Sequence, residues 1–125
     1  MRQIKFRAQD IASNKWLYGD LRHHKDDVCI FEQGGTKGEQ VKRDTVGQFT
    51  GLRDINGKDI YEGDILDVNY ADEESRLEVR FVRGVFAFLW NGDLDDEFPC
   101  NAPTHEWAKV IGNIYDNPEL LNKEE

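Results

Sequence analysis

The chain has 125 residues, including three Trp, seven Phe and four Tyr, and it carries a formal net charge of −9. This length fits one small domain, and no segment approaches the run of about 20 apolar residues that a membrane-spanning helix requires. The acidic charge disfavours nucleic acid as a general partner, because binding to phosphates depends on clustered Lys and Arg.

The first half of the chain alternates strand patterns with polar turns. Ile4, Phe6 and Ala8 alternate with Lys5 and Arg7, which predicts a strand with one buried face. Further strands are expected at residues 16–18, 28–31 and 46–52, with a turn at 10–15 and a glycine-rich loop at 34–38. The strand at 16–18 can pair back on the first strand.

The second half contains stronger hairpin signals. Asn56-Gly57 favours a tight hairpin, because both residues tolerate positive φ. Leu77, Val79 and Phe81 form a second alternating run, which predicts a half-buried strand. The other expected elements are strands at 65–70, 85–90 and 107–115, the last interrupted at Gly112, turns at 62–64, 83–84 and 91–93, an acidic loop at 71–75, an irregular segment at 95–104, and a short helical turn at 117–121 with Asn117 as its cap.

Short strands that arrive every ~8–12 residues with turns between them are typical of a small barrel or sandwich. We therefore expect a mainly β chain without a long helix. A seam between two segments is expected near residues 42–45, where loop gives way to a denser series of strands.

Two acidic clusters are the residues that could carry chemistry. Asp93, Asp95, Asp96 and Glu97 crowd one turn, and residues 72–74 form a second group. Crowded carboxylates can hold a divalent cation or raise one another's pKa for acid–base work. Neither cluster has a His or Cys at metal-ligand spacing, so solvated loop charge is the simpler interpretation. No glycine pattern matches a phosphate or dinucleotide loop, and we expect no cofactor.

Trp90 stands directly before the acidic turn. With Asp93, Asp95 and Asp96 it forms a candidate interaction surface, because a tryptophan beside a polar turn can anchor a protein partner.

The N-terminus and the cysteines favour a cytoplasmic protein. Residues 1–7 are charged and no apolar stretch follows them, which is not the pattern of a signal peptide. Cys29 and Cys100 are isolated from each other in the sequence, so we expect two reduced thiols rather than a disulfide framework.

Three segments resemble the YopX family of phage and prophage proteins. The central one is QFTGLRDINGKDIYEGDI at residues 48–65, and the others are IKFRA at 4–8 and VIGNIYDNPELL at 110–121. The resemblance implies a phage or prophage origin, self-assembly and an SH3-like barrel or roll. With the seam above, it leads us to expect an N-terminal β segment at 1–44 packed on an SH3-like β-barrel at 45–125, in one compact domain that ends in a short helical turn.

The family has no established activity to carry over. Its signature positions are interpreted as structural, either in turns or in a polar network that pins the barrel, although some could line a groove instead. These positions are Gln48, Thr50, Gly51, Gly57, Tyr61, Gly63 and Asp64.

Three hypotheses for function remain open. The first is a non-enzymatic binding or assembly module that forms a homo-oligomer and binds a phage or host protein. The second is an acidic decoy for a host DNA-binding protein: residues 1–53 hold ten Lys/Arg and seven Asp/Glu, a net of +3, whereas residues 54–125 hold six and eighteen, a net of −12. The third is a metal-assisted enzyme that uses the carboxylates of residues 93–97.

Overall fold

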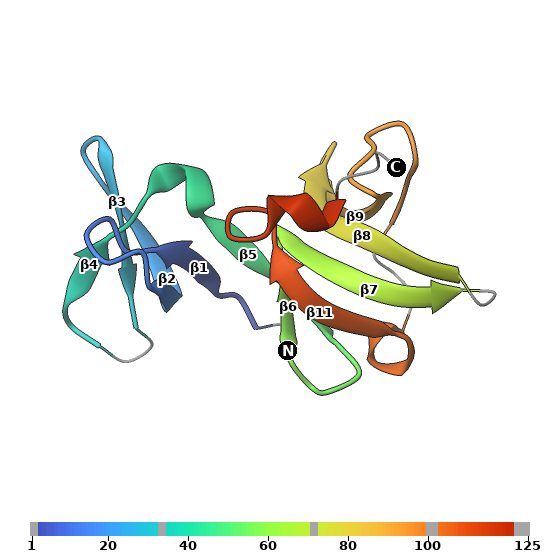
Figure 1. The fold of residues 1–125 in the computed structure, drawn as a ribbon. Helices are drawn as coiled ribbons and strands as arrows, with labels where there is room; N and C mark the ends of the chain where they lie inside the picture. The colour runs from blue at the N-terminus through green and yellow to red at the C-terminus, as the bar shows by residue number, and fades with distance from the viewer. Residues whose placement is uncertain (1–2, 33–34, 71–72, 100–102, 122–125) are drawn as a thin grey trace. The chain divides into compact units, whose positions relative to one another are not determined.

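The computed structural model describes residues 3–32, 35–70, 73–99 and 103–121, and the protein is mainly β, as the sequence predicts (Figure 1). The chain divides into two compact units, Met1–Phe49 (unit 1) and Thr50–Glu125 (unit 2). The packing of residues 1–44 against a barrel, and a single compact domain, stay predictions.

The strands are β1 Phe6–Gln9, β2 Trp16–His24, β3 Asp27–Phe31, β4 Gly38–Gln40, β5 Gly47–Arg53, β6 Asp59–Tyr61, β7 Asp64–Tyr70, β8 Glu73–Val82, β9 Val85–Trp90, β10 Glu97–Pro99 and β11 Ala108–Asn113. Three 3₁₀ turns, η1 Arg43–Thr45, η2 Thr104–Glu106 and η3 Pro118–Leu121, join or end them. The expected C-terminal helical turn is therefore present as η3. Strand β5 begins in unit 1 and continues into unit 2.

The strands of unit 1 belong to a sheet in the order β4-β3-β2-β1-β5-β6, whose last strand, β6, is part of unit 2. The predicted pairing of β2 back on β1 is confirmed, with Ala8 opposite Leu17. The sheet is curled, because the end of β1 meets the end of β4: the Ile11 N–H donates to the Gln40 carbonyl (3.0 Å), and the Lys42 N–H donates to the Gln9 carbonyl (2.8 Å). An isolated bridge between Asp10 and Val41 lies between these two bonds.

The concave side of unit 1 is apolar. Ala8, Val28, Ile30 and Val41 form its buried core, and Phe6, Leu17, Leu21 and Val46 pack against them. The prediction for Ile4 is wrong, since its side chain is 56% exposed and the strand begins only at Phe6. Arg7 is buried instead, with its guanidinium over the Trp16 ring at 4.7 Å from the centroid.

Unit 2 contains an antiparallel sheet in the order β10-β9-β8-β7-β11. Its core is formed by Ile60, Leu66, Val68, Leu77, Val79, Phe88 and Ala108. The Phe88 ring lies at the centre of an aromatic group, 5.3 Å from Phe98 and 5.7 Å from Trp107 between centroids. The predicted interruption at Gly112 is a register shift in the β11–β7 pairing.

Several details differ from the sequence-based expectations. Strands β4 and β10 were expected as loop or irregular chain, and residues 73–75 belong to β8 rather than to an acidic loop. On β8, Glu78 is buried whereas Phe81 is 50% exposed, although simple alternation predicts the reverse. Glu78 is buried because the second face of β8 is also covered at that point. Phe81 shares the face of the buried Leu77 and Val79 but is exposed because it stands near the end of the β8–β9 hairpin. Residues 71–72 and Cys100 lie outside the described residues.

The described strands form no closed barrel, so the SH3-like barrel stays a prediction. In the described ranges no helix is long and apolar enough to cross a membrane.

Candidate functional site

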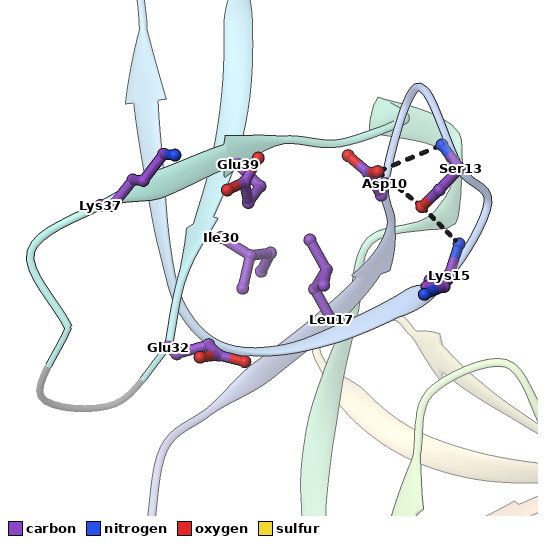
Figure 2. Close-up of a pocket in the computed structure, with 8 residues that line it drawn as sticks. All are labelled: Asp10, Ser13, Lys15, Leu17, Ile30, Glu32, Lys37 and Glu39. Carbon is purple, nitrogen blue, oxygen red and sulfur yellow. Dashed lines mark hydrogen bonds between the residues drawn. The ribbon is translucent and has the colours of Figure 1, made fainter.

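A hollow opens where the sheet of unit 1 curls, and we call it the mouth. It has a volume of about 350 Å³ and is lined by Asp10, Ser13, Lys15, Leu17, Ile30, Glu32, Lys37 and Glu39. Figure 2 shows Leu17 and Ile30 in the middle, with the charged residues around them. Ligand sites are often found in such openings of rolled sheets.

The walls of the mouth are positioned by strand pairing. Ile30 on β3 is 1% exposed, and Glu39 lies opposite it on β4. On the other side Asp10 follows β1, and its Oδ2 accepts hydrogen bonds from the Ser13 hydroxyl (2.6 Å) and the Ser13 N–H (3.1 Å). The pKa of Asp10 is lowered, mainly because the side-chain hydrogen bond from Ser13 stabilises the charged form. This carboxylate is therefore charged at neutral pH.

The other charges of the mouth are exposed and carry both signs. Glu32, Glu39, Lys15 and Lys37 form no ion pair with any residue that the structure describes. With Asp10 they give three carboxylates and two ammonium groups around an apolar floor.

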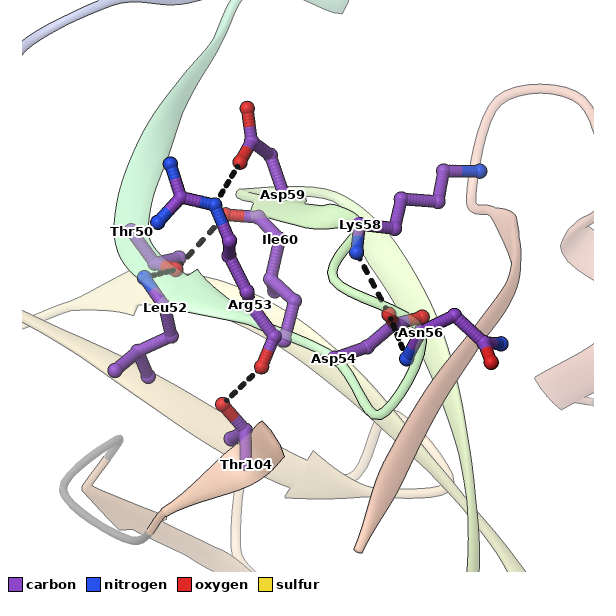
Figure 3. Close-up of polar contacts among 9 residues, drawn as sticks. All are labelled: Thr50, Leu52, Arg53, Asp54, Asn56, Lys58, Asp59, Ile60 and Thr104. Carbon is purple, nitrogen blue, oxygen red and sulfur yellow. Dashed lines mark hydrogen bonds and ion pairs between the residues drawn. The ribbon is translucent and has the colours of Figure 1, made fainter. Parts of the chain in front are cut away.

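A second polar centre lies in unit 2, around Asp54 (Figure 3). Its side chain is 2% exposed, and Oδ1 accepts the backbone N–H groups of Asn56 and Lys58, both at 2.9 Å. Oδ2 accepts the Val110 N–H, also at 2.9 Å. Burial alone raises the pKa of Asp54, but these three bonds and the Lys58 charge outweigh it, so the pKa is lowered overall.

Asp54 therefore joins the β5–β6 hairpin to the outer edge of β11. The neighbouring Ile55 N–H donates to the Ala108 carbonyl at 2.8 Å, which satisfies a second group on that edge. The Thr104 hydroxyl adds a bond to the Arg53 carbonyl (2.8 Å). An edge strand whose polar groups are covered in this way is protected from pairing with another chain.

Other residues of segment 48–65 also bond to backbone. The Thr50 hydroxyl donates to the Ile60 carbonyl across the β5–β6 pair (2.8 Å) and accepts the Leu52 N–H within β5 (3.1 Å). Asp64, which is 1% exposed, accepts the Tyr61 N–H through Oδ2 at 2.7 Å. The glycines of the segment, Gly51, Gly57 and Gly63, all have positive φ. Gln48 pairs with Phe6 across β5 and β1.

An apolar surface lies at the end of the β8–β9 hairpin, and we call it the hairpin end. Phe81 and Val85 are 50% and 53% exposed. On the face of Val85, a groove of about 270 Å³ is lined by Val82, Arg83, Val85, Ala87, Glu97, Phe98 and Pro99, whereas Phe81 points to the other face of the hairpin. The guanidinium of Arg83 pairs with the Glu97 carboxylate, at 2.7 Å from Oε1.

The acidic turn before β10 is held mainly by its own backbone. Asp93 Oδ1 accepts the Asp95 N–H (2.9 Å), and the Asp96 carbonyl accepts the Trp90 N–H (3.0 Å). Trp90 is half-buried and packs against the core of unit 2, with its ring 5.7 Å from that of Phe98. Within the described ranges no three His, Cys, Asp or Glu side chains converge as a metal site.

Comparison with known proteins identifies the family. A family model described as YopX protein matches residues 5–122, nearly the whole chain. The chain belongs to the YopX family. Among solved structures it is similar to protein EF1440 from Enterococcus faecalis, with a TM-score of 0.60 and 27% identity over 98% of this chain and 100% of that one. No curated protein matches it.

The geometry clarifies what the YopX-like segment at 48–65 does in this chain. Its polar side chains Thr50, Asp54 and Asp64 bond to backbone groups. Sequence reasoning missed Asp54 as the centre of this network, although a carboxylate before Asn-Gly is a recognised turn signal. It also missed the mouth, because that hollow depends on contacts between β1 and β4.

Proposed function

We propose that this YopX-family protein is a non-enzymatic binding module that associates with copies of itself. In this proposal it is encoded by a phage or prophage, acts in the host cytoplasm and has a phage or host protein as its further partner. We also propose that unit 2 is an SH3-like roll that presents the hairpin end.

The observation that carries the proposal is the apolar surface at the hairpin end. Phe81 packs edge-on against Phe86 with centroids 5.1 Å apart, and it still exposes half of its surface. Val82 and Val85 face each other across the last pair of the hairpin. The pair Val82 and Val85 borders the groove, whereas the pair Phe81 and Phe86 points to the other face of the hairpin, so apolar side chains emerge on both faces of its end. Exposed apolar side chains gathered at one end of a sheet are typical anchors of a protein interface.

Charge on the same surface supports a second copy as the partner. Arg83, with its side chain 74% exposed, and Glu97 supply one charge of each sign next to the apolar residues. Within one chain Arg83 and Glu97 pair with each other, so this part of the surface has no net charge to repel a second copy, and in a two-fold arrangement the two copies can exchange these pairs across the interface. A surface that holds both signs is self-complementary in this geometry.

The test is light scattering after size-exclusion chromatography over a range of protein concentrations. We expect the mass of the unaltered protein to be at least twice the 14.5 kDa of one chain, and the Val85→Glu variant to be monomeric. Ile55→Glu is the matched control, because Ile55 is also in unit 2 and is 56% exposed. A monomeric wild-type protein at every concentration, or equal effects of both variants, would contradict self-association through the hairpin end.

A further inference from the structure

We propose that the mouth of unit 1 binds an aliphatic ammonium group, presented as the lysine side chain of a bound protein. This inference rests on the proposed function only in that the protein is a binding module, and it names the chemistry that a partner offers. It concerns a surface of unit 1, whereas the self-association above uses the hairpin end of unit 2.

The floor of the mouth fits a hydrocarbon stem. Leu17 from β2 and Ile30 from β3 both belong to the apolar side of the sheet, and Leu17 is only half-buried. Water over such a floor makes few good hydrogen bonds, so the methylene groups of a lysine replace it favourably. The hollow, at about 350 Å³, is large enough for a single long side chain.

The rim favours a positive rather than a negative end group. Three carboxylates, Asp10, Glu32 and Glu39, face two ammonium groups, Lys15 and Lys37. Asp10 is held by the bridge to Val41 and by the hydrogen bond from Ser13, and the backbone of Glu39 is held opposite Ile30 within β4. The two lysines lie just outside β2 and β4, on long flexible stems that can turn toward solvent.

An ammonium group over the floor would therefore meet carboxylates from two sides of the curled sheet. Glu39 and Glu32 make no ion pair with the described residues, so among these an incoming cation has no ion-pair partner to displace. A carboxylate ligand would meet Lys15 and Lys37, which also line the hollow, but it would face the larger number of negative charges, those of Asp10, Glu32 and Glu39. The net charge of the rim thus selects the cation.

The experiment is a titration of the full chain followed by methyl NMR at Leu17 and Ile30. The probe is lysine with both backbone ends blocked as amides. Blocked norleucine has the same stem without the charge, blocked aminoadipate reverses the charge, and cadaverine represents a free diamine. We expect saturable shifts at both residues with blocked lysine, with a dissociation constant in the millimolar range, and no saturation with norleucine or aminoadipate.

Two variants, each of which removes one carboxylate charge, test the role of the rim. Glu39→Gln is expected to weaken binding of blocked lysine about two- to five-fold, the size of one partly exposed ion pair. Glu106→Gln, at an exposed carboxylate of unit 2, is the matched control and should leave binding unchanged. The proposal is wrong if no probe saturates, if norleucine or aminoadipate binds as well as lysine, or if cadaverine binds more than ten-fold tighter. These outcomes are independent of the oligomeric state, so failure here and failure of self-association can be told apart.

Discussion

At the scale of single residues, buried carboxylates organise unit 2. Asp54 and Asp64 are at most 2% exposed, and each accepts backbone N–H groups. A charged oxygen that accepts such donors forms bonds stronger than those between neutral groups, which offsets the cost of removing the charge from water. Sequence predicts that Asp64 stands in a turn, but the burial of Asp54 depends on the arrival of Val110 from a distant strand.

Substitution of Asp54 by Ala is expected to lower the free energy of unfolding by about 3 kcal/mol, because three backbone donors lose a charged acceptor. Asp54→Asn keeps the shape and one acceptor oxygen, but it turns an amide N–H toward the Val110 N–H, so we expect a smaller loss. Urea denaturation at neutral pH measures both. Equal stability of the wild type and Asp54→Ala would show that water replaces these bonds at no cost.

The same carboxylate makes stability depend on pH. Because the pKa of Asp54 is lowered in the folded state, its contribution is complete above the ordinary value of 3.8 and is lost as the pH falls through the folded value. The stability difference between the wild type and Asp54→Asn should therefore be constant near neutrality and shrink in acid below 3.8. Urea denaturation of both proteins at a series of acidic pH values tests this. If the stability difference grows in acid instead, the pKa of Asp54 is not lowered in the folded state.

At the scale of elements, tight turns were predicted well and short edge strands were not. The β5–β6 turn is wider than Asn56-Gly57 alone: it covers residues 54–58, with Gly57 but not Asn56 at positive φ. Arg83-Gly84 and Asn91-Gly92 turn the chain with both residues at positive φ. These signals are local, because the backbone conformation selects the residue type. Strands β4 and β10 have three residues each and carry no alternating pattern. They are strands because β3 and β9 offer them an edge, which is information from the tertiary structure.

Substitution of two glycines at positive φ distinguishes the cost of backbone strain from the cost of a steric clash. At Gly84 (φ 87°) an added Cβ would meet nothing within 4 Å, so Gly84→Ala should cost only the backbone term, about 1 kcal/mol. At Gly92 (φ 78°) the Cβ would lie 3.0 Å from the carboxylate of Glu78 and 3.3 Å from Leu121. Glu78 is buried and accepts a 2.8 Å bond from Arg80, so it cannot move freely.

We therefore expect Gly92→Ala to cost about 2 kcal/mol or more, clearly above Gly84→Ala. Thermal and urea unfolding of the two variants give the comparison, with the wild type as reference. Equal losses would mean that the carboxylate of Glu78 and the side chain of Leu121 adjust without strain.

At the scale of the whole molecule, the chain builds two cores. Unit 1 buries a small cluster around Ile30, and unit 2 a larger aliphatic and aromatic cluster around Phe88. The mainly β class follows from alternation and turn spacing in the sequence. The sequence suggests a seam near residues 42–45, whereas the two units divide after Phe49. The mouth does not follow from the sequence, because it depends on which distant strands pair: Gln9–Ile11 meet Gln40–Lys42 across the intervening strands β2 and β3. Long-range pairing of this kind leaves no local signal.

Because the core of unit 1 is smaller than that of unit 2, we expect the strands of unit 1 to open locally more often. A unit of about 49 residues with a few buried aliphatic side chains has little apolar area to offset its chain entropy. Amide hydrogen exchange should therefore be faster in β2 and β3 than in β8 and β9, whose residues surround the Phe88 cluster. Ile30→Ala should widen this gap, since it removes a side chain that is 1% exposed from the smaller core. The contrary result is that β3 amides exchange as slowly as β9 amides and that both exchange rates respond equally to denaturant. The two cores would then open as one cooperative structure, and the two units would not differ in stability.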